Sequence, residues 1–222
     1  MEDLELFSLL HLADSALPVG SFAFSFGLES MAKHGQLGSV QDFSDHLSCV
    51  LSQSCAFEVP ILQSMFNPQQ FAAALNFYHV CTRVPHLRKA SEIQGRAWLR
   101  LLRRTHPCLP FDKIDVIFKD SGRPSYFLAV FSQVMLALGH SIDRALQLFL
   151  YCGLRDQVSA AIRLGLVGPG LGHAILSQQL QTIPSLLGPA RGKIFSDAVR
   201  TLAVLDVAQL AHSQLYSKQY QN

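Results

Sequence analysis

The sequence predicts an all-α fold, a single compact domain of about eight to ten helices spanning residues 1–222. Apolar residues recur at intervals of three and four along most of the chain, which is the helical period. Nowhere do alternating apolar and polar runs follow one another between hairpin turns, as a sheet would require. The composition, 49% hydrophobic and only 15% charged, supplies a large core and leaves apolar patches for partners to cover, which favours an oligomer.

The charge and the cysteines of the chain argue against nucleic-acid binding and against secretion. A net charge of +2 is too weak to indicate nucleic-acid binding. Arg100, Arg103 and Arg104 form one local basic end, which we interpret as a solvated helix terminus. Five cysteines without a CxxC motif, and a start that lacks a secretion signal, predict the reducing cytoplasm. The most apolar run, residues 126–138, is too short to cross a bilayer, so no membrane partner is expected.

The first two predicted helices, residues 4–13 and 28–34, flank an ordered hinge. Pro18 and Gly20 forbid one continuous helix across it. Leu17 and the three phenylalanines of the hinge are apolar, so they need a covering surface.

The next helices start at recognisable caps. Ser39 and Asp42 have the spacing of a capping box and open a helix that Pro60 bends or restarts. Asn67-Pro68 reads as a cap followed by a proline at the first helical position. A long helix is predicted over residues 86–104.

The second half contains one weak stretch. Residues 105–123 carry two prolines and a glycine and are predicted to be a loose connection. Buried and amphipathic helices follow over residues 126–138 and from the cap Ser141 to 164. Two further helices are predicted, over residues 173–182 and 193–216.

The hinge also carries a long mixed motif. Its residues are Asp14, Ser15, Leu17, Pro18, Gly20, Ser21, Phe22, Ser25, Gly27, Leu28 and Glu29. They fall on the pattern Asp-Ser-x-Leu-Pro-x-Gly-(Gly/Ser)-Phe-x-x-Ser-x-Gly-Leu-Glu, through which the chain resembles the urease accessory protein F family. From chemistry alone, Ser21 or Ser25 can cap the following helix, Gly20 supplies a backbone angle that side chains disfavour, and Gly27 allows a close neighbour. A core-packed turn without any partner explains the same residues.

Two weaker matches extend the resemblance over most of the chain. Residues 150–168 are similar to a family segment written Leu-Tyr-x6-Val-x-Ala-Ala-x-Arg-Leu, and they contain Arg155 and Arg163. Helix packing explains most of that pattern. The chain end is similar to a family tail, His-x-x-x-Tyr-x-Arg-Leu-Phe/Tyr. The matched positions there are His212, Leu215, Tyr216, Lys218 and Tyr220.

The tail departs from the family pattern at two positions. Lys218 stands where Arg is usual, and Gln219 where Leu is usual, so a bidentate contact there would be weakened. On a helix, Tyr216 and Tyr220 would share a face with His212. We therefore predict a tail that frays alone and orders on a partner, with packing back onto the core as the alternative.

Catalytic and metal-binding patterns are weak. His46 and Cys49 lie on one predicted helix face but lack a nearby third ligand, so no metal site is expected. His11, Asp14 and Ser15 lack the surroundings of a nucleophile elbow and are interpreted as local capping. Residues 188–193 resemble a phosphate loop only superficially and are interpreted as a helix boundary. No catalytic residue is proposed.

The resemblance implies a non-catalytic chaperone of urease maturation. Such a protein forms a homodimer, binds a second urease accessory protein, and with it recruits the nickel-carrying GTPase to apo-urease for nickel insertion. Nickel and GTP would then sit on the partner proteins, with no cofactor bound stably here. The motif residues listed above, with Arg155, Arg163 and the matched tail residues, would be partner-binding. The alternatives are a small α-helical enzyme and a helical adaptor unrelated to urease.

Overall fold

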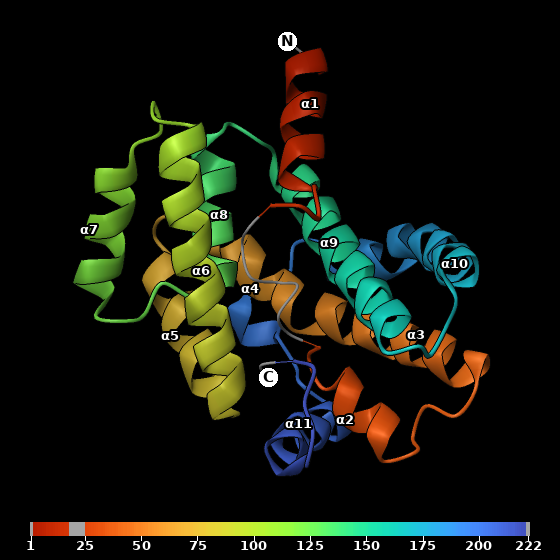
Figure 1. Ribbon diagram of the computed structural model, residues 1–222. Helices are drawn as coiled ribbons and strands as arrows, with labels where there is room; N and C mark the ends of the chain where they lie inside the picture. The colour runs from red at the N-terminus through yellow and green to blue at the C-terminus, as the bar shows by residue number, and fades with distance from the viewer. Residues whose placement is uncertain (1, 18–24, 221–222) are drawn as a thin grey trace.

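The computed structural model describes residues 2–17 and 25–220. These residues form α-helices and short 3-10 turns, with no β-strand among them, so the all-α prediction is confirmed (Figure 1). In chain order the helices are α1 (Glu2–Leu12), α2 (Leu28–Lys33), α3 (Val40–Ala56), α4 (Glu58–Met65), α5 (Phe71–Cys81), α6 (Pro85–Thr105), α7 (Phe111–Ser121), α8 (Phe127–Ala137), α9 (Ile142–Arg163), α10 (Pro169–Leu187) and α11 (Ala203–Ala211). The 3-10 turns are η2 (Gly188–Ala190), η3 (Phe195–Asp197) and η4 (His212–Gln214).

The helices pack in two groups around α4 and α9. Helices α5, α6, α7 and α8 lie on one side of Figure 1, and α3 and α10 lie on the other. Helices α6 and α8 pair closely, as do α9 and α10, while α4 touches α3, α5, α8 and α9. Helix α1 projects from the body, and α2 and α11 lie together near the C-terminus.

Helix α4 is the centre of the core because it is apolar on nearly every side. Val59, Ile61, Leu62 and Met65 are completely buried. Helix α3 ends at Ala56 and α4 begins two residues later, so the proline at position 60 lies in the first turn of a new helix, where its missing N–H is harmless. The predicted restart is confirmed.

Two predicted helix caps are present. Ser39 Oγ accepts a hydrogen bond from the Asp42 N–H at 3.1 Å, and Asp42 Oδ2 accepts one from the Ser39 N–H at 2.8 Å. Ser141 Oγ likewise accepts from the Arg144 N–H at 3.3 Å at the start of α9. Local chemistry therefore sets these boundaries.

The stretch predicted as a loose connection contains a helix. Helix α7 buries Phe111, Ile114 and Phe118, whose spacing of three and four places them on one face. The prolines precede this helix and Gly122, with φ of 61°, ends it. The breakers mark its ends rather than a structureless segment, so the prediction was wrong.

The last predicted helix, residues 193–216, was also wrong in extent. Only α11, flanked by η3 and η4, is helical there. Gln53 on α3 explains the interruption. Its Oε1 accepts from the N–H groups of Thr201 and Leu202, at 2.8 and 2.9 Å, and its Nε2 donates to the Val199 carbonyl at 2.8 Å. Backbone groups that a helix would pair internally are satisfied by this buried amide instead.

Two other helices have different starts from those predicted. Helix α5 begins at Phe71, because the Asn67 side chain accepts from the Gln69 N–H at 3.0 Å and holds a turn first. Helix α10 is longer than residues 173–182, since Pro169 occupies its first turn and Pro184 is accommodated inside it. Among the described helices none combines the length and the apolar character that crossing a bilayer requires.

Candidate functional site

The hinge motif begins where α1 ends. Asp14 Oδ1 accepts a hydrogen bond from the Ala16 N–H at 2.8 Å, which confirms the local capping interpretation, while Ser15 is exposed. Leu17 is partly buried against the core. The motif positions Pro18, Gly20, Ser21 and Phe22, and the prediction for the Gly20 backbone, lie outside the described residues.

The motif continues at the start of α2, where it meets α11. Ser25 is completely buried, and its Oγ accepts from the Glu29 N–H at 3.3 Å, so it satisfies a first-turn N–H of α2 from two residues before the N-cap, Gly27. Gly27 has φ of 92°, and a Cβ there would lie 3.0 Å from Gln209 Cγ. Gln209 Nε2 also donates to the Phe26 carbonyl at 3.2 Å. The close approach predicted at Gly27 is therefore confirmed, and its backbone angle favours glycine independently.

Glu29 is the polar centre of this region. Its side chain is completely buried, and each carboxylate oxygen accepts two hydrogen bonds or ion pairs. Oε1 faces Lys33 Nζ at 3.1 Å and the Gln219 N–H at 2.8 Å. Oε2 faces His212 Nε2 at 2.8 Å and the Tyr220 N–H at 3.2 Å. We call these five residues the Glu29 cluster, and they join the hinge motif to the C-terminal tail.

The environment of Glu29 favours its charged form. Burial alone would raise the pKa of this carboxyl, but the hydrogen bonds from the Gln219 N–H, His212 and Lys33 together outweigh burial, and the pKa is lowered from 4.5. Among the described residues, His212 Nδ1 has no hydrogen-bond partner. Because an ionised carboxylate can only accept, Nε2, which lies 2.8 Å from Glu29 Oε2, is the ring nitrogen that donates.

Tyr220 connects the tail to the second matched segment. Its hydroxyl donates to the Ala160 carbonyl at 3.3 Å, and the Arg163 guanidinium lies 4.8 Å from the centre of its ring. Arg163 Nε also donates to the Ser159 carbonyl at 3.2 Å on its own helix. Tertiary folding thus brings three separate stretches of the chain together around Glu29 and Tyr220.

The predicted aromatic stripe of the tail is absent, because residues after η4 leave the helical path. His212 and Tyr220 are buried in the Glu29 cluster, whereas Tyr216 is fully exposed. Leu215 is partly exposed, and Lys218 Nζ donates to the Ser213 carbonyl at 3.0 Å. The prediction of a tail that frays alone is therefore wrong in this structure, and the alternative of a tail packed on its own core holds.

Arg155, predicted to act with Arg163, lies elsewhere. Its guanidinium pairs with Asp156, with Nε 2.9 Å from Oδ1, and also donates to the Ala13 carbonyl at the end of α1. It therefore ties α9 to the start of the hinge rather than to the tail. The two arginines of the second match serve different contacts.

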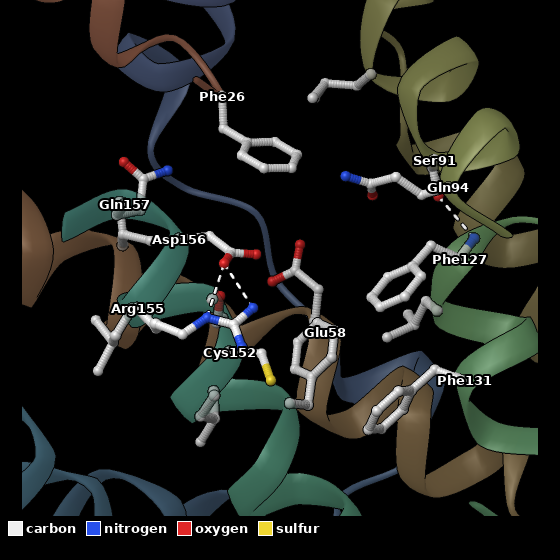
Figure 2. Close-up of a pocket in the computed structure, with 18 of the residues that line it drawn as sticks. Phe26, Glu58, Ser91, Gln94, Phe127, Phe131, Cys152, Arg155, Asp156 and Gln157 are labelled. Atoms are coloured by element: carbon white, nitrogen blue, oxygen red, sulfur yellow. Dashed lines mark hydrogen bonds and ion pairs between the residues drawn. The ribbon is translucent and has the colours of Figure 1, made fainter. Parts of the chain in front are cut away.

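A cavity of about 250 Å³ lies between the hinge and helices α4, α6, α8 and α9. In Figure 2, Phe127 and Phe131 face it from α8, while Arg155, Asp156 and Gln157 come from α9. Asp14, Leu17 and Phe26 of the hinge motif also line it. The apolar residues at the two ends of the hinge thus border an aromatic cavity with a few polar groups.

Glu58 is the unusual polar group of this cavity. Burial raises its pKa from 4.5 to about 7, although Arg200 opposes the rise electrostatically. Arg200 is itself engaged with Asp206, with Nε 3.1 Å from Oδ2. Glu58 can therefore change its charge near neutral pH, which is a property shared by many acid and base groups of active sites.

No metal centre is assembled in the part of the chain that the structure describes. No group of three His, Cys, Asp or Glu side chains there is placed to hold a metal ion. His46 is buried, with Nε2 3.3 Å from Gln157 Oε1, whereas Cys49 is exposed. The stretch that resembles a phosphate loop forms η2 after the end of α10, so it is a helix boundary as predicted.

Several residues of the site were missed from the sequence. Lys33 lies one helical turn after Glu29 and could have been found by that spacing alone. Gln209 and Gln219 carry no signal, because their partners lie more than 180 residues away along the chain. Glu58 follows a phenylalanine at a helix start, and only its tertiary surroundings make it unusual.

Comparison with known proteins gives a consistent result. Residues 38–180 match the model of the UreF family. The chain is 27% identical to "Urease accessory protein F" of Arabidopsis thaliana over 217 residues, covering 93% of this chain and 88% of that protein. It is 27% identical over 223 residues to "Uncharacterized urease accessory protein UreF-like" of Schizosaccharomyces pombe, covering 94% of each. It is 24% identical over 227 residues to "Urease accessory protein UreF" of Marinomonas sp., covering 99% and 95%.

Proposed function

Because the chain belongs to the UreF family, the urease accessory protein F family, we propose that it serves urease maturation as a non-catalytic scaffold. In this proposal it forms a homodimer and binds a second urease accessory protein. Together they recruit a nickel-carrying GTPase to apo-urease. Nickel is cargo and GTP belongs to the GTPase, so this chain needs no cofactor of its own. The complex would work in the cytoplasm.

The observation that carries the scaffold proposal is the anchoring of the tail by the Glu29 cluster. The buried contacts of His212 and Tyr220 hold the tail at both ends, and Tyr216 projects between them with its whole ring exposed. An aromatic side chain on an anchored segment loses little conformational freedom when a partner covers it. This arrangement supports a docking role for the tail.

Exposed apolar residues support association with other proteins. On α1, Leu4, Phe7 and Leu10 are 75%, 64% and 57% exposed. On α11, Val207 and Leu210 are 62% and 48% exposed. Large apolar side chains clustered in this way commonly mark contact surfaces. These two sets of residues are the surfaces that we propose for the homodimer and partner contacts.

The test is reconstitution with purified proteins. The chain, the second accessory protein, the GTPase and apo-urease are mixed with nickel, bicarbonate and GTP, and complex formation and urea hydrolysis are measured. Tyr216→Ala should fold normally, bind the second accessory protein at least about tenfold more weakly, and reduce urease activation. Val116→Ala, a smaller truncation to alanine at a 52% exposed position on α7, is the control and should behave as wild type. Normal assembly and activation by the Tyr216 variant would remove the tail from the docking account.

The cavity beside Glu58 supports one other candidate, a small helical enzyme. A carboxyl group with a pKa of about 7 in an aromatic cavity is suited to proton transfer. The purified chain alone is assayed for hydrolysis of urea and of GTP, with Glu58→Gln as the variant. The scaffold proposal predicts no turnover by either protein. Turnover that Glu58→Gln abolishes would establish the enzyme instead.

A further inference from the structure

Helix α6 and the two residues before it concentrate the positive charge of the protein. Residues 83–104 contain seven of the 18 Lys and Arg and one of the 16 Asp and Glu, a local charge of +6. The rest of the chain holds eleven cations and fifteen anions, a charge of −4. The overall value of +2 therefore conceals a strong separation of charge.

The cations of α6 share one exposed face. Lys89, Arg96, Arg100, Arg103 and Arg104 are all exposed, and at 100° per residue they fall within an arc of about 100°. We call them the cationic stripe. The opposite face of the helix is buried and includes Gln94, Trp98 and Leu102. From Lys89 to Arg104 the stripe extends about 22 Å along the helix axis.

Two arginines of the stripe are neutralised along one edge. Arg96 pairs with Glu92 at 2.5 Å, and Arg103 pairs with Asp115 of α7. Lys89, Arg100 and Arg104 form no ion pair with any described residue. The basic end predicted from the sequence to be a solvated terminus is therefore part of a longer surface, of which one edge is left without counter-charge.

We propose that the cationic stripe is a docking surface for an acidic amphipathic helix of a partner protein. The surface uses none of the residues of the Glu29 cluster, so this proposal goes beyond the scaffold role and can fail without it. Charge complementarity is the main argument, since a helix of about four turns with carboxylates at intervals of three and four would match the stripe in length and period.

The composition of the stripe favours a protein over a nucleic acid. Four of its five cations are arginines, which are enriched in protein interfaces because they are weakly hydrated and can bind carboxylates through two hydrogen bonds. Ile93 is 39% exposed in the middle of the stripe and offers an apolar contact. No aromatic side chain interrupts the stripe for stacking on unpaired bases.

The experiment measures binding of the full chain to a labelled helical peptide by fluorescence anisotropy. The probe has glutamates on one face and leucines beside them, and a second peptide with glutamine at each glutamate is the charge control. Lys89→Glu, Arg100→Glu and Arg104→Glu are combined in one stripe variant. Lys113→Glu, Lys119→Glu and Lys193→Glu, three exposed positions outside the stripe, make a control variant with the same net charge. If the stripe variant does not fold, the corresponding glutamine substitutions replace it.

The expected result is binding of the glutamate peptide by wild type and by the control variant. The stripe variant should bind at least about tenfold more weakly, and added salt should weaken the wild-type complex. Absence of wild-type binding, or equal losses in both variants, would overturn the proposal. If wild type binds a DNA duplex more tightly than the peptide, and the stripe variant does not bind the duplex, the stripe is a nucleic-acid surface instead. A change of oligomeric state in the stripe variant alone would replace it with a contact between copies.

Discussion

Replacing Glu29 with glutamine tests how firmly the tail is held. Wild-type Glu29 offers two charged oxygens to four donors, from Lys33, His212, Gln219 and Tyr220. Glutamine retains one carbonyl oxygen, while its amide group points N–H bonds at groups that are themselves donors. At least one pair of donors therefore loses its acceptor beside a side chain that is itself completely buried.

The expected loss of stability follows from these contacts. A hydrogen bond to a charged group contributes about 1.5–3 kcal/mol, and breaking a buried ion pair destabilises by about 3–5 kcal/mol. Lys33 is partly exposed and recovers water, so its share is small. We therefore expect a decrease of about 3 kcal/mol in the free energy of unfolding. For a chain of 222 residues this corresponds to a decrease in Tm of about 6 °C.

The assay combines thermal unfolding with hydrogen exchange. The amide protons of Gln219 and Tyr220 should exchange faster in the variant, because they lose their acceptor. Glu92→Gln, which removes a surface ion pair on α6, is the control and should change stability by less than about 1 kcal/mol. If both variants have the same Tm and the same exchange rates at the tail, Glu29 does not anchor it.

The dependence on pH provides a second readout of the same variant. The pKa of Glu29 is lower in the folded protein than its ordinary value of 4.5. Ionised Glu29 therefore stabilises the fold above pH 4.5, and this contribution is lost as the pH falls through the folded-state pKa. The stability difference between wild type and Glu29→Gln should shrink in acid. A difference that stays constant from neutral to strongly acidic pH would contradict this account.

Three further predictions concern other parts of the molecule. Glu58→Gln should stabilise the protein by up to about 3 kcal/mol more at pH 8 than at pH 5, as measured by urea unfolding. The reason is that the folded-state pKa of about 7, above the unfolded value of 4.5, makes ionisation of Glu58 destabilising at high pH. An equal effect of the substitution at the two pH values would refute the assignment. Gly95→Ala should destabilise by about 3 kcal/mol, since its Cβ would lie 2.0 Å from the Ser125 carbonyl oxygen, whereas Gly153→Ala has open space and should stabilise α9 by up to about 1 kcal/mol; Tm values of both variants decide. Tyr216→Ala should leave Tm within about 1 °C of wild type, because the exposed ring makes no contribution to the core; a larger fall would place that ring in the fold rather than on a docking surface.

Sequence periodicity alone predicts the fold class and most of the helices. The caps at Ser39 and Ser141 act on groups three residues away, so their effect is readable from a short window. The hinge motif likewise predicts that Ser25 bonds the first turn of α2 and that Gly27 allows a close approach, and both contacts are present. These features depend on neighbours along the chain, which a sequence displays directly.

Helix-breaking residues predict structure less clearly than helix-forming residues do. The prolines and the glycine of residues 105–123 predict a loose connection, but in the structure they lie at the two ends of α7. A helix of that length shows only three apolar positions on its buried face, a weak signal beside strong punctuation. Local helix propensity therefore fails to predict α7, because the stability of this helix comes from burying Phe111, Ile114 and Phe118.

The Glu29 cluster and the path of the tail were decided by tertiary structure alone. Glu29 is one glutamate among the sixteen acidic residues, and nothing near it predicts that it will bind backbone groups at positions 219 and 220. Gln53 similarly intercepts the backbone at positions 199–202 and stops a helix that the local pattern favours. A buried acceptor outweighs helix propensity because each unpaired backbone group in the core costs about 1–3 kcal/mol, while propensities differ by less than about 1 kcal/mol per residue. Sequence thus determined which segments are apolar and most of those that are helical, and long-range polar contacts determined the path of residues 199–220.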